Sequence, residues 1–352
     1  MSSDLNISCV VFGASGYAGA ELARLIHTHP HLQLNKLFVS AKSTDAGKLF
    51  SELYPQYTGL IDLPLIAGTE HNIDTLLSEV SDNQTYMFLA TPHEFSHDIA
   101  ASLLADNVTV FDLSGGFRLK DKNAYKTYYG FEHKYSNLLE KTPYGLPEWN
   151  AEQLPEQNLI SLPGCYPTAS QLALKPLILN DLIKNDCVPV INAVSGVSGA
   201  GRKANLATSF CELSLKPYNL FVHRHTPEIE QGLGCKVIFT PHVANFDRGI
   251  LATIVVQVKN SVTEQDINQA FADKYKEQPL VRLRSAIPTI KDVANTPFCD
   301  LYWQLDGNHL IVISAIDNLL KGASSQAIQC ANIVAKLPQE TGLVSTSQSK
   351  EF

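Results

Sequence analysis

The chain has 352 residues, 45% of them hydrophobic and 18% charged, and this length and composition predict a globular protein of two domains. Its formal net charge of -8 argues against nucleic acid or an anionic membrane surface as the main partner, and no apolar run is long enough to span a membrane. Seven cysteines, an odd number with no Cys-x-x-Cys pair, fit neither a disulfide framework nor a cysteine zinc site, so we expect a reducing, cytoplasmic location.

The first predicted unit is a strand, a glycine turn and a helix. Residues 7–12 are apolar enough for a buried strand, and they run directly into Gly13-Ala-Ser-Gly16-Tyr-Ala-Gly19, beyond which apolar residues recur with helical spacing. Glycine lets the backbone approach a pyrophosphate, and the helix N-terminus stabilises its charge. We therefore predict a dinucleotide site, against the alternative of a plain tight turn, formed by Gly13, Ser15, Gly16, Tyr17, Ala18 and Gly19.

The next predicted strand, residues 34–39, ends in Ser40-Ala-Lys42-Ser43. Enzymes that use NAD tend to carry an acidic residue at this place, where it binds the ribose hydroxyls. Hydroxyl groups and a lysine suit a ribose 2′-phosphate instead, so Ser40 and Lys42 predict NADP as the cofactor. The alternative is a solvated loop of ordinary composition.

A further strand, residues 86–90, ends at Thr91-Pro92, which we also expect to contact the cofactor. The following residues, His93-Glu94-Phe95-Ser96-His97, match the H-E-x-x-H pattern of zinc hydrolases. Pro92 places His93 in the first turn of a helix just behind a strand end, and no third ligand motif follows. We therefore predict no metal site, and a zinc hydrolase built on His93, Glu94 and His97 remains an alternative of a different class.

Residues 108–113 repeat the strand pattern and lead into Ser114-Gly-Gly-Phe-Arg118. A guanidinium beside glycines at a sheet edge is well suited to bind a carboxylate. Arg118 is therefore a candidate substrate contact, and the alternative is a surface charge.

Cys165 lies where an extended apolar segment, residues 159–162, is broken by Pro163-Gly164 and followed by a segment with helical spacing. Pro167 fits a first helical turn, so Cys165 should lie at or just before the helix N-terminus. Free amides and the helix dipole favour the nucleophilic thiolate there. We predict that Cys165 is a catalytic nucleophile, against the alternative of a buried structural cysteine.

The second half of the chain has a different pattern. Residues 188–194 and 250–258 are β-rich and partly alternating, which predicts an antiparallel or mixed sheet in a second domain. Between them lie a glycine-rich polar loop, residues 195–202, and His223-Arg-His-Thr-Pro-Glu228, for which an exposed polar strand end is the alternative to a site. We predict a loop over residues 239–250, with Arg248 just before a strand, then a strand over 310–316 and a final helix that starts at Asp317-Asn318.

Six segments resemble the N-acetyl-γ-glutamyl-phosphate reductases of arginine biosynthesis, and they follow that family's order along nearly the whole chain. They are Gly13-Ala-Ser-Gly-Tyr-Ala-Gly19, Pro163-Gly-Cys-Tyr-Pro-Thr-Ala169, Ser195-Gly-Val-Ser-Gly-Ala-Gly-Arg202, His223-Arg-His-Thr-Pro-Glu-Ile229, Phe239-Thr-Pro-His242 and Asp317-Asn-Leu-Leu-Lys-Gly-Ala323. Aspartate-semialdehyde dehydrogenases, and lysine-pathway reductases that act on aminoadipyl phosphate, are similar enough to remain alternatives.

The resemblance implies an α/β protein with an NADP-binding Rossmann domain, residues 1–164 and 318–352. It implies an α+β substrate and dimerisation domain, residues 165–317, with a mostly antiparallel or mixed sheet. The implied reaction is the NADPH-dependent reduction of an acyl phosphate, N-acetyl-γ-glutamyl phosphate, to N-acetyl-L-glutamate 5-semialdehyde. A homo-oligomer, dimer or tetramer, is implied as well.

Acyl-phosphate reduction gives the matched residues their expected roles. Cys165 would attack the γ-carbonyl and form a thioester, with His223 as the acid/base partner and His225 as its close rival. Asn318 would bind the nicotinamide amide of the cofactor. The expected substrate contacts are Arg118, Ser195, Arg202, His225 and Glu228.

Overall fold

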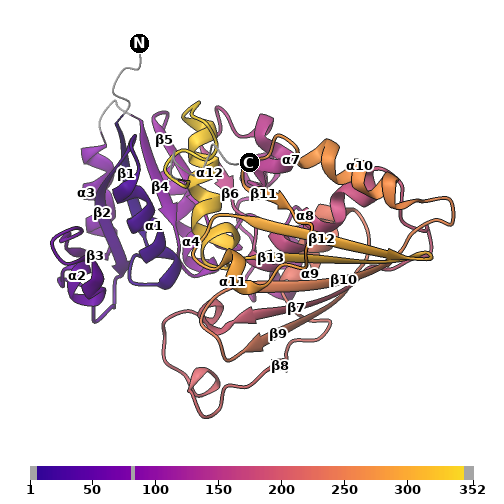
Figure 1. Ribbon diagram of the computed structural model, residues 1–352. Helices are drawn as coiled ribbons and strands as arrows, with labels where there is room; N and C mark the ends of the chain where they lie inside the picture. Colours follow the sequence, from indigo (N-terminus) through magenta and orange to yellow (C-terminus); the bar gives the residue numbers. More distant parts are fainter. Residues whose placement is uncertain (1–5, 81–83, 345–352) are drawn as a thin grey trace. The chain divides into compact units, whose positions relative to one another are not determined.

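The computed structural model describes residues 6–80 and 84–344, and these residues form two compact units (Figure 1). The first unit contains the described residues up to Asn123, residues 131–163 and the residues from Ala323 onward. The second contains residues 124–130 and 164–322. The domain boundaries expected from the sequence, 1–164 with 318–352 against 165–317, stay a prediction.

The first unit is built on a six-stranded parallel sheet in the order β3-β2-β1-β4-β5-β6. Its strands are β1 (Ile7–Phe12), β2 (Leu32–Ser40), β3 (Leu65–Gly68), β4 (Thr85–Leu89), β5 (Val108–Asp112) and β6 (Leu159–Ser161). Its helices are α1 (Tyr17–Thr28), α2 (Phe50–Leu53), α3 (Glu70–Glu79), α4 (His93–Leu103), α6 (Ser136–Lys141), α7 (Pro147–Asn150) and α12 (Ser325–Val334). Strand order reverses between β1 and β4, which makes the carboxyl ends of these strands the expected ligand-binding edge.

Continuous apolar runs produce this sheet because helices cover it and leave its central strands no solvated face. Every residue of β4 and β5 is buried. Aromatic rings from neighbouring strands stack in the core, with 4.7 Å between the ring centroids of Phe12 and Phe38 and 5.0 Å between those of Phe88 and Phe111. Full burial of one such side chain stabilises the fold by roughly 1.5–3 kcal/mol.

The second unit has a seven-stranded mixed sheet in the order β11-β12-β13-β10-β7-β9-β8. Its strands are β7 (Val190–Gly196), β8 (Lys216–Pro217), β9 (Ile238–Ala244), β10 (Ile250–Gln257), β11 (Val281–Leu283), β12 (Cys299–Asp306) and β13 (His309–Ile316). Its helices are α8 (Cys165–Leu179), α9 (His225–Leu233), α10 (Glu264–Tyr275) and α11 (Ile290–Val293), and α5 (Asn123–Tyr128) starts at the boundary of the unit. The predicted α/β class, with a parallel first sheet and a mixed second one, is confirmed.

Burial along β10 explains why the sequence of this sheet alternates. Buried residues such as Ile250, Ala252 and Ile254 alternate with half-buried ones, so one face of the strand is fully covered. Helix α8 packs against β10 and β13 on this sheet, and α9 and α10 pack beside α8. Nearly all of α8 is buried as a result, which fixes its N-terminal residue, Cys165, with respect to the sheet.

Two predicted elements differ from the structure. The loop expected over residues 239–250 is wrong for residues 239–244, because residues 238–244 form β9, which pairs in parallel with β7 over its full length. Residues 245–249 join β9 to β10 as expected. Pro241 obscured this strand in the sequence, although proline is tolerated near a sheet edge, and only the two residues of β8 lie outside β9. The final helix begins at Ser325 rather than at Asp317, and a π-helical turn over Leu320–Ser324 precedes it.

Among the described residues, none of the helices is both long and apolar enough to cross a membrane.

Candidate active site

The glycine turn of the first unit lies against a cavity of about 300 Å³ at the carboxyl ends of β1, β2 and β4. Six of the residues predicted to bind the cofactor line this cavity, namely Gly13, Ser15, Gly16, Ser40, Thr91 and Pro92. Phe38, Val39 and Phe95 add an apolar wall that the sequence did not predict. A mostly apolar cleft with a few polar groups at this edge of a parallel sheet is the usual form of a nucleotide site.

Close packing explains why glycine occupies the first and last positions of the turn. A Cβ atom on Gly13 would lie 2.1 Å from the carbonyl oxygen of Ala90, and the φ angle of Gly13 is +84°. A Cβ atom on Gly19 would lie 2.2 Å from the carbonyl oxygen of Gly13. Gly16 differs, because a Cβ there would meet nothing closer than 3.4 Å. Its small size therefore keeps open the space in front of the N-terminus of α1.

The predicted cofactor residues of this unit differ in exposure and bonding. Tyr17 and Ala18 form the first turn of α1, with the Tyr17 side chain 38% exposed. Ser40 and Lys42 are exposed, and the Lys42 amide lies 3.4 Å from the Ser40 hydroxyl. Thr91 is fixed by a 2.6 Å hydrogen bond between its hydroxyl and that of Ser96.

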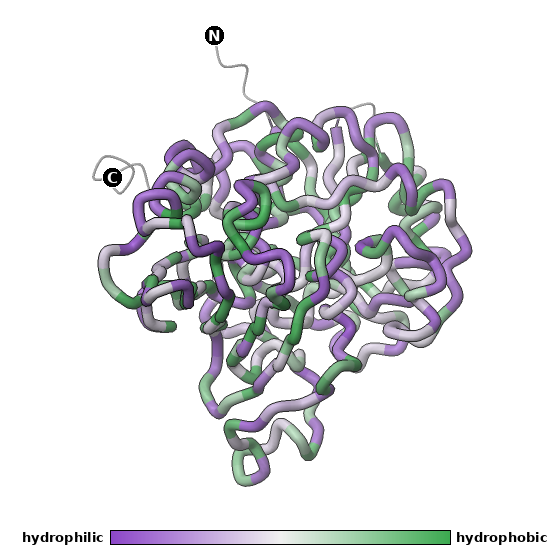
Figure 2. The backbone as a smooth tube through the Cα atoms, turned by 90° about the vertical axis from the view of Figure 1, so that its right-hand side faces the viewer, coloured by the Kyte–Doolittle hydropathy of each residue, from purple (hydrophilic) through white to green (hydrophobic). Residues whose placement is uncertain are grey.

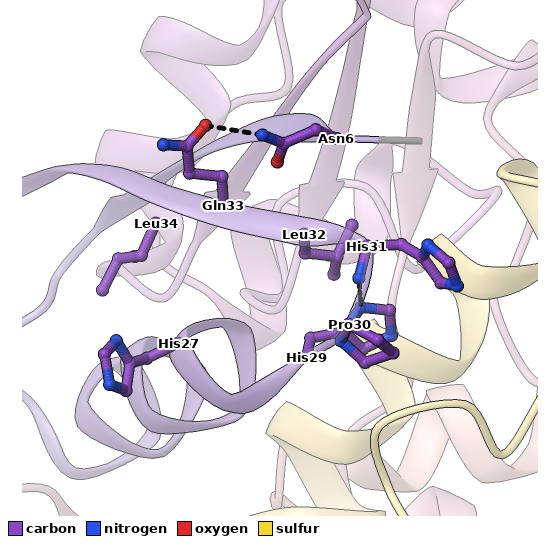
Figure 3. Close-up of a pocket in the computed structure, with 8 residues that line it drawn as sticks. All are labelled: Asn6, His27, His29, Pro30, His31, Leu32, Gln33 and Leu34. Atoms are coloured by element: carbon purple, nitrogen blue, oxygen red, sulfur yellow. Dashed lines mark hydrogen bonds between the residues drawn. The ribbon is translucent and has the colours of Figure 1, made fainter. Parts of the chain in front are cut away.

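A second hollow, of about 470 Å³, lies at the opposite end of the sheet, around the start of β2 (Figure 3). It is bordered by His27, in the last turn of α1, and by His29 and His31, on the segment that joins α1 to β2. His29 is buried, and its Nε2 atom lies 3.0 Å from both the Asn332 Oδ1 atom and the Thr341 carbonyl oxygen. These bonds give His29 a role in holding the segment that follows α12, at the edge of the sheet opposite the ligand-binding one.

The two histidines of the H-E-x-x-H segment form hydrogen bonds with backbone amides. His93 accepts a 2.7 Å hydrogen bond from the amide of Gly115, and His97 Nε2 accepts one of 3.0 Å from the amide of Lys134. His97 Nδ1 lies 3.0 Å from a carboxylate oxygen of Asp98. Within residues 6–80 and 84–344, no group of three or more His, Cys, Asp or Glu side chains is arranged to hold a metal ion.

Arg118 is buried and bonded to the main chain. Its Nε atom donates to the carbonyl of Leu162 and its Nη2 atom to that of Leu113, both at 2.7 Å. Leu162 ends the extended segment that leads to Cys165, so Arg118 fixes the path of the chain towards the cysteine. Its predicted contact with a substrate carboxylate stays a prediction.

In the second unit, Cys165 is the first residue of α8, as predicted, and its side chain is partly exposed. Gly164 is the N-cap, with extended backbone angles and no side chain to cap the helix. The buried carboxylate of Glu228 accepts the Gly164 amide hydrogen at 2.8 Å. Glu228 thus orients the residue before the thiol, a contact that the sequence did not predict.

Two buried histidines lie beside the residue that follows Cys165. The Tyr166 ring centroid lies 5.7 Å from that of His223 and 5.9 Å from that of His225, and the two imidazoles are 4.8 Å apart. The Tyr166 hydroxyl donates to the carbonyl of His242 and accepts from the Tyr218 hydroxyl. His225 starts α9, so the exposed strand end considered as an alternative for this segment is wrong.

The tautomer of neutral His223 follows from one backbone contact. The amide of His225 donates to His223 Nδ1 at 3.0 Å, so the neutral ring carries its proton on Nε2. Burial, followed by the nearby charge of Arg224, lowers the pKa of His223 from 6.5 to about 4. His223 is therefore neutral at physiological pH and presents a hydrogen-bond donor through Nε2.

The remaining predicted site residues differ in exposure. Ser195 is buried and its hydroxyl donates to the carbonyl of Gly196, whereas Arg202 is exposed on the loop that follows β7. Asn318 is buried; its side chain accepts from the amide of Gly249 and donates to the hydroxyl of Ser198. The structure thus gives Asn318 a structural role beside its predicted contact with nicotinamide.

Comparisons with known families agree with this division of the site. Residues 8–157 match the family model described as the NAD binding domain of semialdehyde dehydrogenases. Residues 165–318 match the model described as the semialdehyde dehydrogenase dimerisation domain. The match boundary falls next to Cys165.

Curated relatives match over nearly the full chain. N-acetyl-γ-glutamyl-phosphate reductase of Vibrio parahaemolyticus is 52% identical over 339 residues, which cover 96% of this chain and all of that protein. The protein of the same name from Escherichia coli K12 is 53% identical over 328 residues, which cover 93% of this chain and 96% of its own.

Solved structures share the fold at low identity. A crystal structure of aspartate semialdehyde dehydrogenase II from Vibrio cholerae aligns with a TM-score of 0.66 and 17% identity, covering 94% of this chain and 98% of that one. The structure of a probable aspartate-semialdehyde dehydrogenase from Pseudomonas aeruginosa gives 0.65 and 21%, covering 94% and 99%. At these identities the likeness concerns the fold alone.

Proposed function

The chain belongs to the N-acetyl-γ-glutamyl-phosphate reductase family, and from this membership we propose that Cys165 carries the acyl group during catalysis. The reaction is the NADPH-dependent reduction of N-acetyl-γ-glutamyl phosphate to N-acetyl-L-glutamate 5-semialdehyde, with release of phosphate, in arginine biosynthesis. The observation that supports the role of Cys165 is its place as the first residue of α8, partly exposed. Helix-terminal amides favour a thiolate at that place.

The proposed covalent steps begin with attack of the Cys165 sulfur on the γ-carbonyl carbon. A carbon–sulfur bond forms, the carbon–oxygen bond to phosphate breaks, and phosphate leaves with the electron pair. NADPH, when bound, supplies the hydride that reduces the carbonyl carbon of this thioester. The resulting thiohemiacetal oxyanion collapses to the aldehyde, which returns the electron pair of the carbon–sulfur bond to Cys165.

His223 is proposed to stabilise the oxyanion rather than to deprotonate the thiol. Its Nδ1 atom accepts the amide hydrogen of His225, so the neutral ring offers only the Nε2 hydrogen. A donor aimed at developing negative charge stabilises the transition state without transferring a proton. His225 stays the rival for any base role.

The first unit is proposed to bind NADP, the cofactor of this family, at the cavity beside the glycine turn. The fit rests on packing: Gly13 and Gly19 permit backbone approaches that a Cβ atom would prevent, and Gly16 leaves open space at the N-terminus of α1. We propose that Ser40 and Lys42 contact the 2′-phosphate and that Asn318 contacts the nicotinamide amide.

The substrate is proposed to bind in the second unit near Cys165. Exposed Arg202 suits the phosphate or carboxylate of the substrate, since a guanidinium can bind either group with two hydrogen bonds. Ser195, His225 and Glu228 are proposed to complete the site in this unit, and Arg118 of the first unit is proposed to bind the substrate carboxylate. For Arg118 and Glu228, their bonds to the main chain around residues 162–164 indicate that they also position Cys165.

The relatives favour this function over the alternatives. Proteins that are 52–53% identical carry the reductase name, whereas the aspartate semialdehyde dehydrogenase structures are 17–21% identical. The zinc-hydrolase alternative is disfavoured by the same relatives, and His93 and His97 already have bonds to the main chain.

A homo-oligomer is proposed through the loop that joins β7 to β8 and α9 in the second unit. This loop carries Leu206, Phe210, Phe221 and Val222 with 74, 92, 74 and 67% of their surface exposed. The loop lies below β8 in Figure 1, and its apolar stretches are green at the bottom of Figure 2. Its residues fall within the match to the dimerisation domain, which points to a second copy of this chain as the partner.

Light scattering on a Phe210→Glu variant tests this loop. We expect the variant to have a smaller mass than the wild-type oligomer, while Leu60→Glu, at a 60% exposed leucine of the first unit, keeps the wild-type mass. An unchanged mass for Phe210→Glu would remove the loop from the interface.

We also propose a cytoplasmic location, since all seven cysteines lie in the described residues and none of them forms a disulfide.

The role of Cys165 is tested by mixing the enzyme with acyl phosphate in the absence of NADPH. Mass spectrometry should find the acyl group on the peptide that contains Cys165. Cys165→Ser should lose turnover by at least ~10³-fold and still bind NADPH, whereas Cys211→Ser, at an exposed cysteine, should behave like the wild type. No adduct at Cys165 under conditions of full turnover, or a Cys165→Ser variant that keeps a tenth of the activity, would overturn the proposal.

A further inference from the structure

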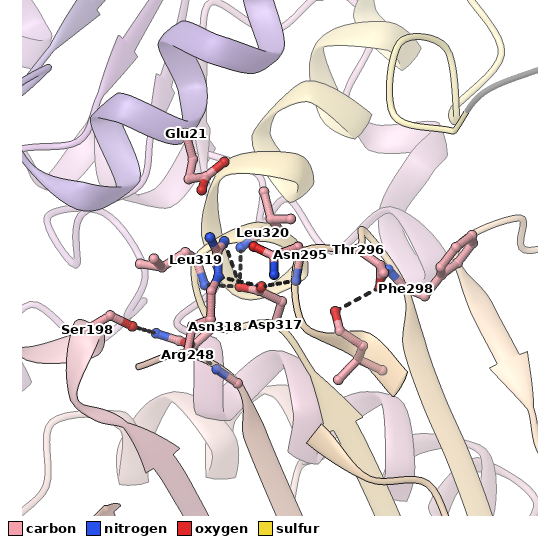
Figure 4. Close-up of polar contacts among 12 residues, drawn as sticks. Glu21, Ser198, Arg248, Asn295, Thr296, Phe298, Asp317, Asn318, Leu319 and Leu320 are labelled. Carbon is pink, nitrogen blue, oxygen red and sulfur yellow. Dashed lines mark hydrogen bonds and ion pairs between the residues drawn. The ribbon is translucent and has the colours of Figure 1, made fainter. Parts of the chain in front are cut away.

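Asp317 has a fully buried carboxylate that accepts hydrogen bonds from four residues of the second unit (Figure 4). Arg248 forms an ion pair with it through two atoms, Nε to Oδ2 at 2.7 Å and Nη2 to Oδ1 at 3.2 Å. The amide of Asn295 donates to Oδ2 at 2.7 Å. The amides of Leu319 and Leu320 donate to Oδ1 at 2.8 and 3.1 Å. A buried charge needs such partners, and here they fix the backbone that follows Asp317.

The turn over residues 317–322 reaches the nucleophile of the proposed mechanism. The carbonyl of Asp317 accepts the amide hydrogen of Gly322 at 2.9 Å, which closes the turn. A Cβ atom on Gly322 would lie 2.7 Å from Cβ and 3.2 Å from Cα of Cys165. Gly322 is thus packed directly against Cys165, and any change in the turn must move one of the two.

The same turn is bonded to the glycine-rich loop after β7. The Oδ1 atom of Asn318 accepts the amide hydrogen of Gly249 at 2.6 Å, and its Nδ2 atom donates to the hydroxyl of Ser198 at 3.0 Å. Both side chains are buried. The turn that begins at Asp317 therefore contacts Cys165 through Gly322 and the loop around Ser198 through Asn318.

We propose that Asp317, paired with Arg248, is a positioning residue for the reaction. It holds the 317–322 turn in the conformation that brings Gly322 against Cys165 and so sets the position of the sulfur. It acts through Gly322 rather than by contact with the substrate. The inference rests on the proposed role of Cys165 and names a residue whose type and place in the sequence suggest a helix cap or a ligand contact.

The second unit contains a matched control. Asp300, on β12, is also fully buried and also pairs with an arginine through two atoms, since Arg282 donates to it at 2.5 and 2.9 Å. The Arg282 guanidinium lies 4.2 Å from the centre of the Phe298 ring. The pair joins β11 to β12, at the edge of the sheet opposite to β8, β9 and β7. Loss of either carboxylate charge should destabilise the unit to a similar extent, but only Asp317 should affect the thiol.

The experiment compares Asp317→Asn with Asp300→Asn in the full-length enzyme. For Asp317→Asn we expect kcat to fall ~10²-fold with KM changed less than ~3-fold, the effect of misplacing a reacting atom by about 1 Å. The rate of Cys165 alkylation by iodoacetamide, followed by peptide mass spectrometry across pH, should also change in magnitude or midpoint. For Asp300→Asn, a comparable fall in Tm with kcat within ~3-fold and an unchanged alkylation profile is expected.

Two milder variants keep the test decisive if Asp317→Asn does not fold. Gly322→Ala should reproduce the loss of kcat and the changed alkylation profile, because the added methyl group must displace Cys165, and Arg248→Lys should show a weaker form of both. Wild-type kcat and alkylation in the folded variants would overturn the positioning role, as would equal losses in Asp300→Asn. The proposed function fails separately, if Cys165→Ser retains turnover.

Discussion

Two strand-to-helix turns in this protein have the same local geometry and use it differently. Helix α1 and helix α8 each begin after an extended glycine N-cap, Gly16 in one and Gly164 in the other, and neither cap has a side-chain hydrogen bond. Neither helix carries an acidic residue in its first turn. Both therefore leave a positive helix terminus available to an anion.

The source of the anion distinguishes the two turns. At α1 the proposed source is the phosphates of a cofactor, and the turn is built from backbone, with its glycines in a single short segment. At α8 the proposed source is the thiolate of Cys165, and the residues around it come from distant segments. Glu228 bonds to Gly164, and Gly322 packs against the cysteine. A turn that binds a ligand can thus be encoded locally, whereas a turn that holds a reactive side chain requires long-range contacts.

The largest effect is expected from alanine at Gly13, with Gly16→Ala as its matched partner. A methyl group on Gly13 would lie 2.1 Å from the Ala90 carbonyl in a left-handed backbone, so Gly13→Ala should lower Tm strongly and abolish NADPH binding. Gly16→Ala should leave Tm nearly unchanged, because its nearest contact is at 3.4 Å, and weaken NADPH at least ~10-fold. Calorimetry and fluorescence titration measure both effects. Unaltered NADPH affinity in Gly16→Ala would show that the cofactor does not approach this turn.

The next effect concerns His223. His223→Ala should lower kcat/KM ~10²-fold, because a hydrogen-bond donor to the oxyanion is lost. His223→Asn should have a kcat/KM about tenfold higher than that of His223→Ala, because its side-chain amide can donate. Since the pKa of His223 is lowered to about 4, the neutral form persists well below pH 6.5, and protonation of Nδ1 disrupts the bond from the His225 amide only near pH 4. The wild-type pH-rate profile should therefore lose activity near pH 4, and His223→Ala should lack this limb. A limb that persists in His223→Ala would assign it to His225.

The two turns also show which features of the site could be predicted from the sequence. The patterns around Gly13 and Cys165 predicted the starts of α1 and α8 because strand, glycine and helix signals lie together within a few residues. The environment of His223 could not be predicted in this way. Its burial depends on Tyr166 and Phe239, which adjoin it only after α8, α9 and β9 have packed together.

Charged residues weakened the sequence pattern of one strand in the second sheet. Strand β12 has the sequence Cys299-Asp-Leu-Tyr-Trp-Gln-Leu-Asp306, and its aspartates weaken the strand signal. Asp300 is nevertheless buried, because Arg282 neutralises it from the neighbouring strand β11. The positioning role proposed for Asp317 has the same origin, since its partner Arg248 lies just before β10. Buried ion pairs between distant segments are the features that local periodicity does not contain.

The smallest effect is expected from Lys42. Its substitution tests whether a side chain binds the 2′-phosphate of NADPH, in addition to the backbone groups of the glycine turn. Lys42→Glu should weaken NADPH about tenfold and NADH less than ~2-fold, because a charge-assisted contact with a 2′-phosphate contributes roughly 1.5 kcal/mol or more and NADH lacks that group. Lys48→Glu is the control: Lys48 is also exposed, makes the same change of charge, and already pairs with Asp45 at 2.9 Å. Titration with both cofactors separates a direct contact from a general change in the electrostatic field. Equal weakening of NADPH and NADH binding by Lys42→Glu, or an equal effect of Lys48→Glu, would show that Lys42 does not contact the 2′-phosphate. Binding of the cofactor would then depend on the glycine turn alone.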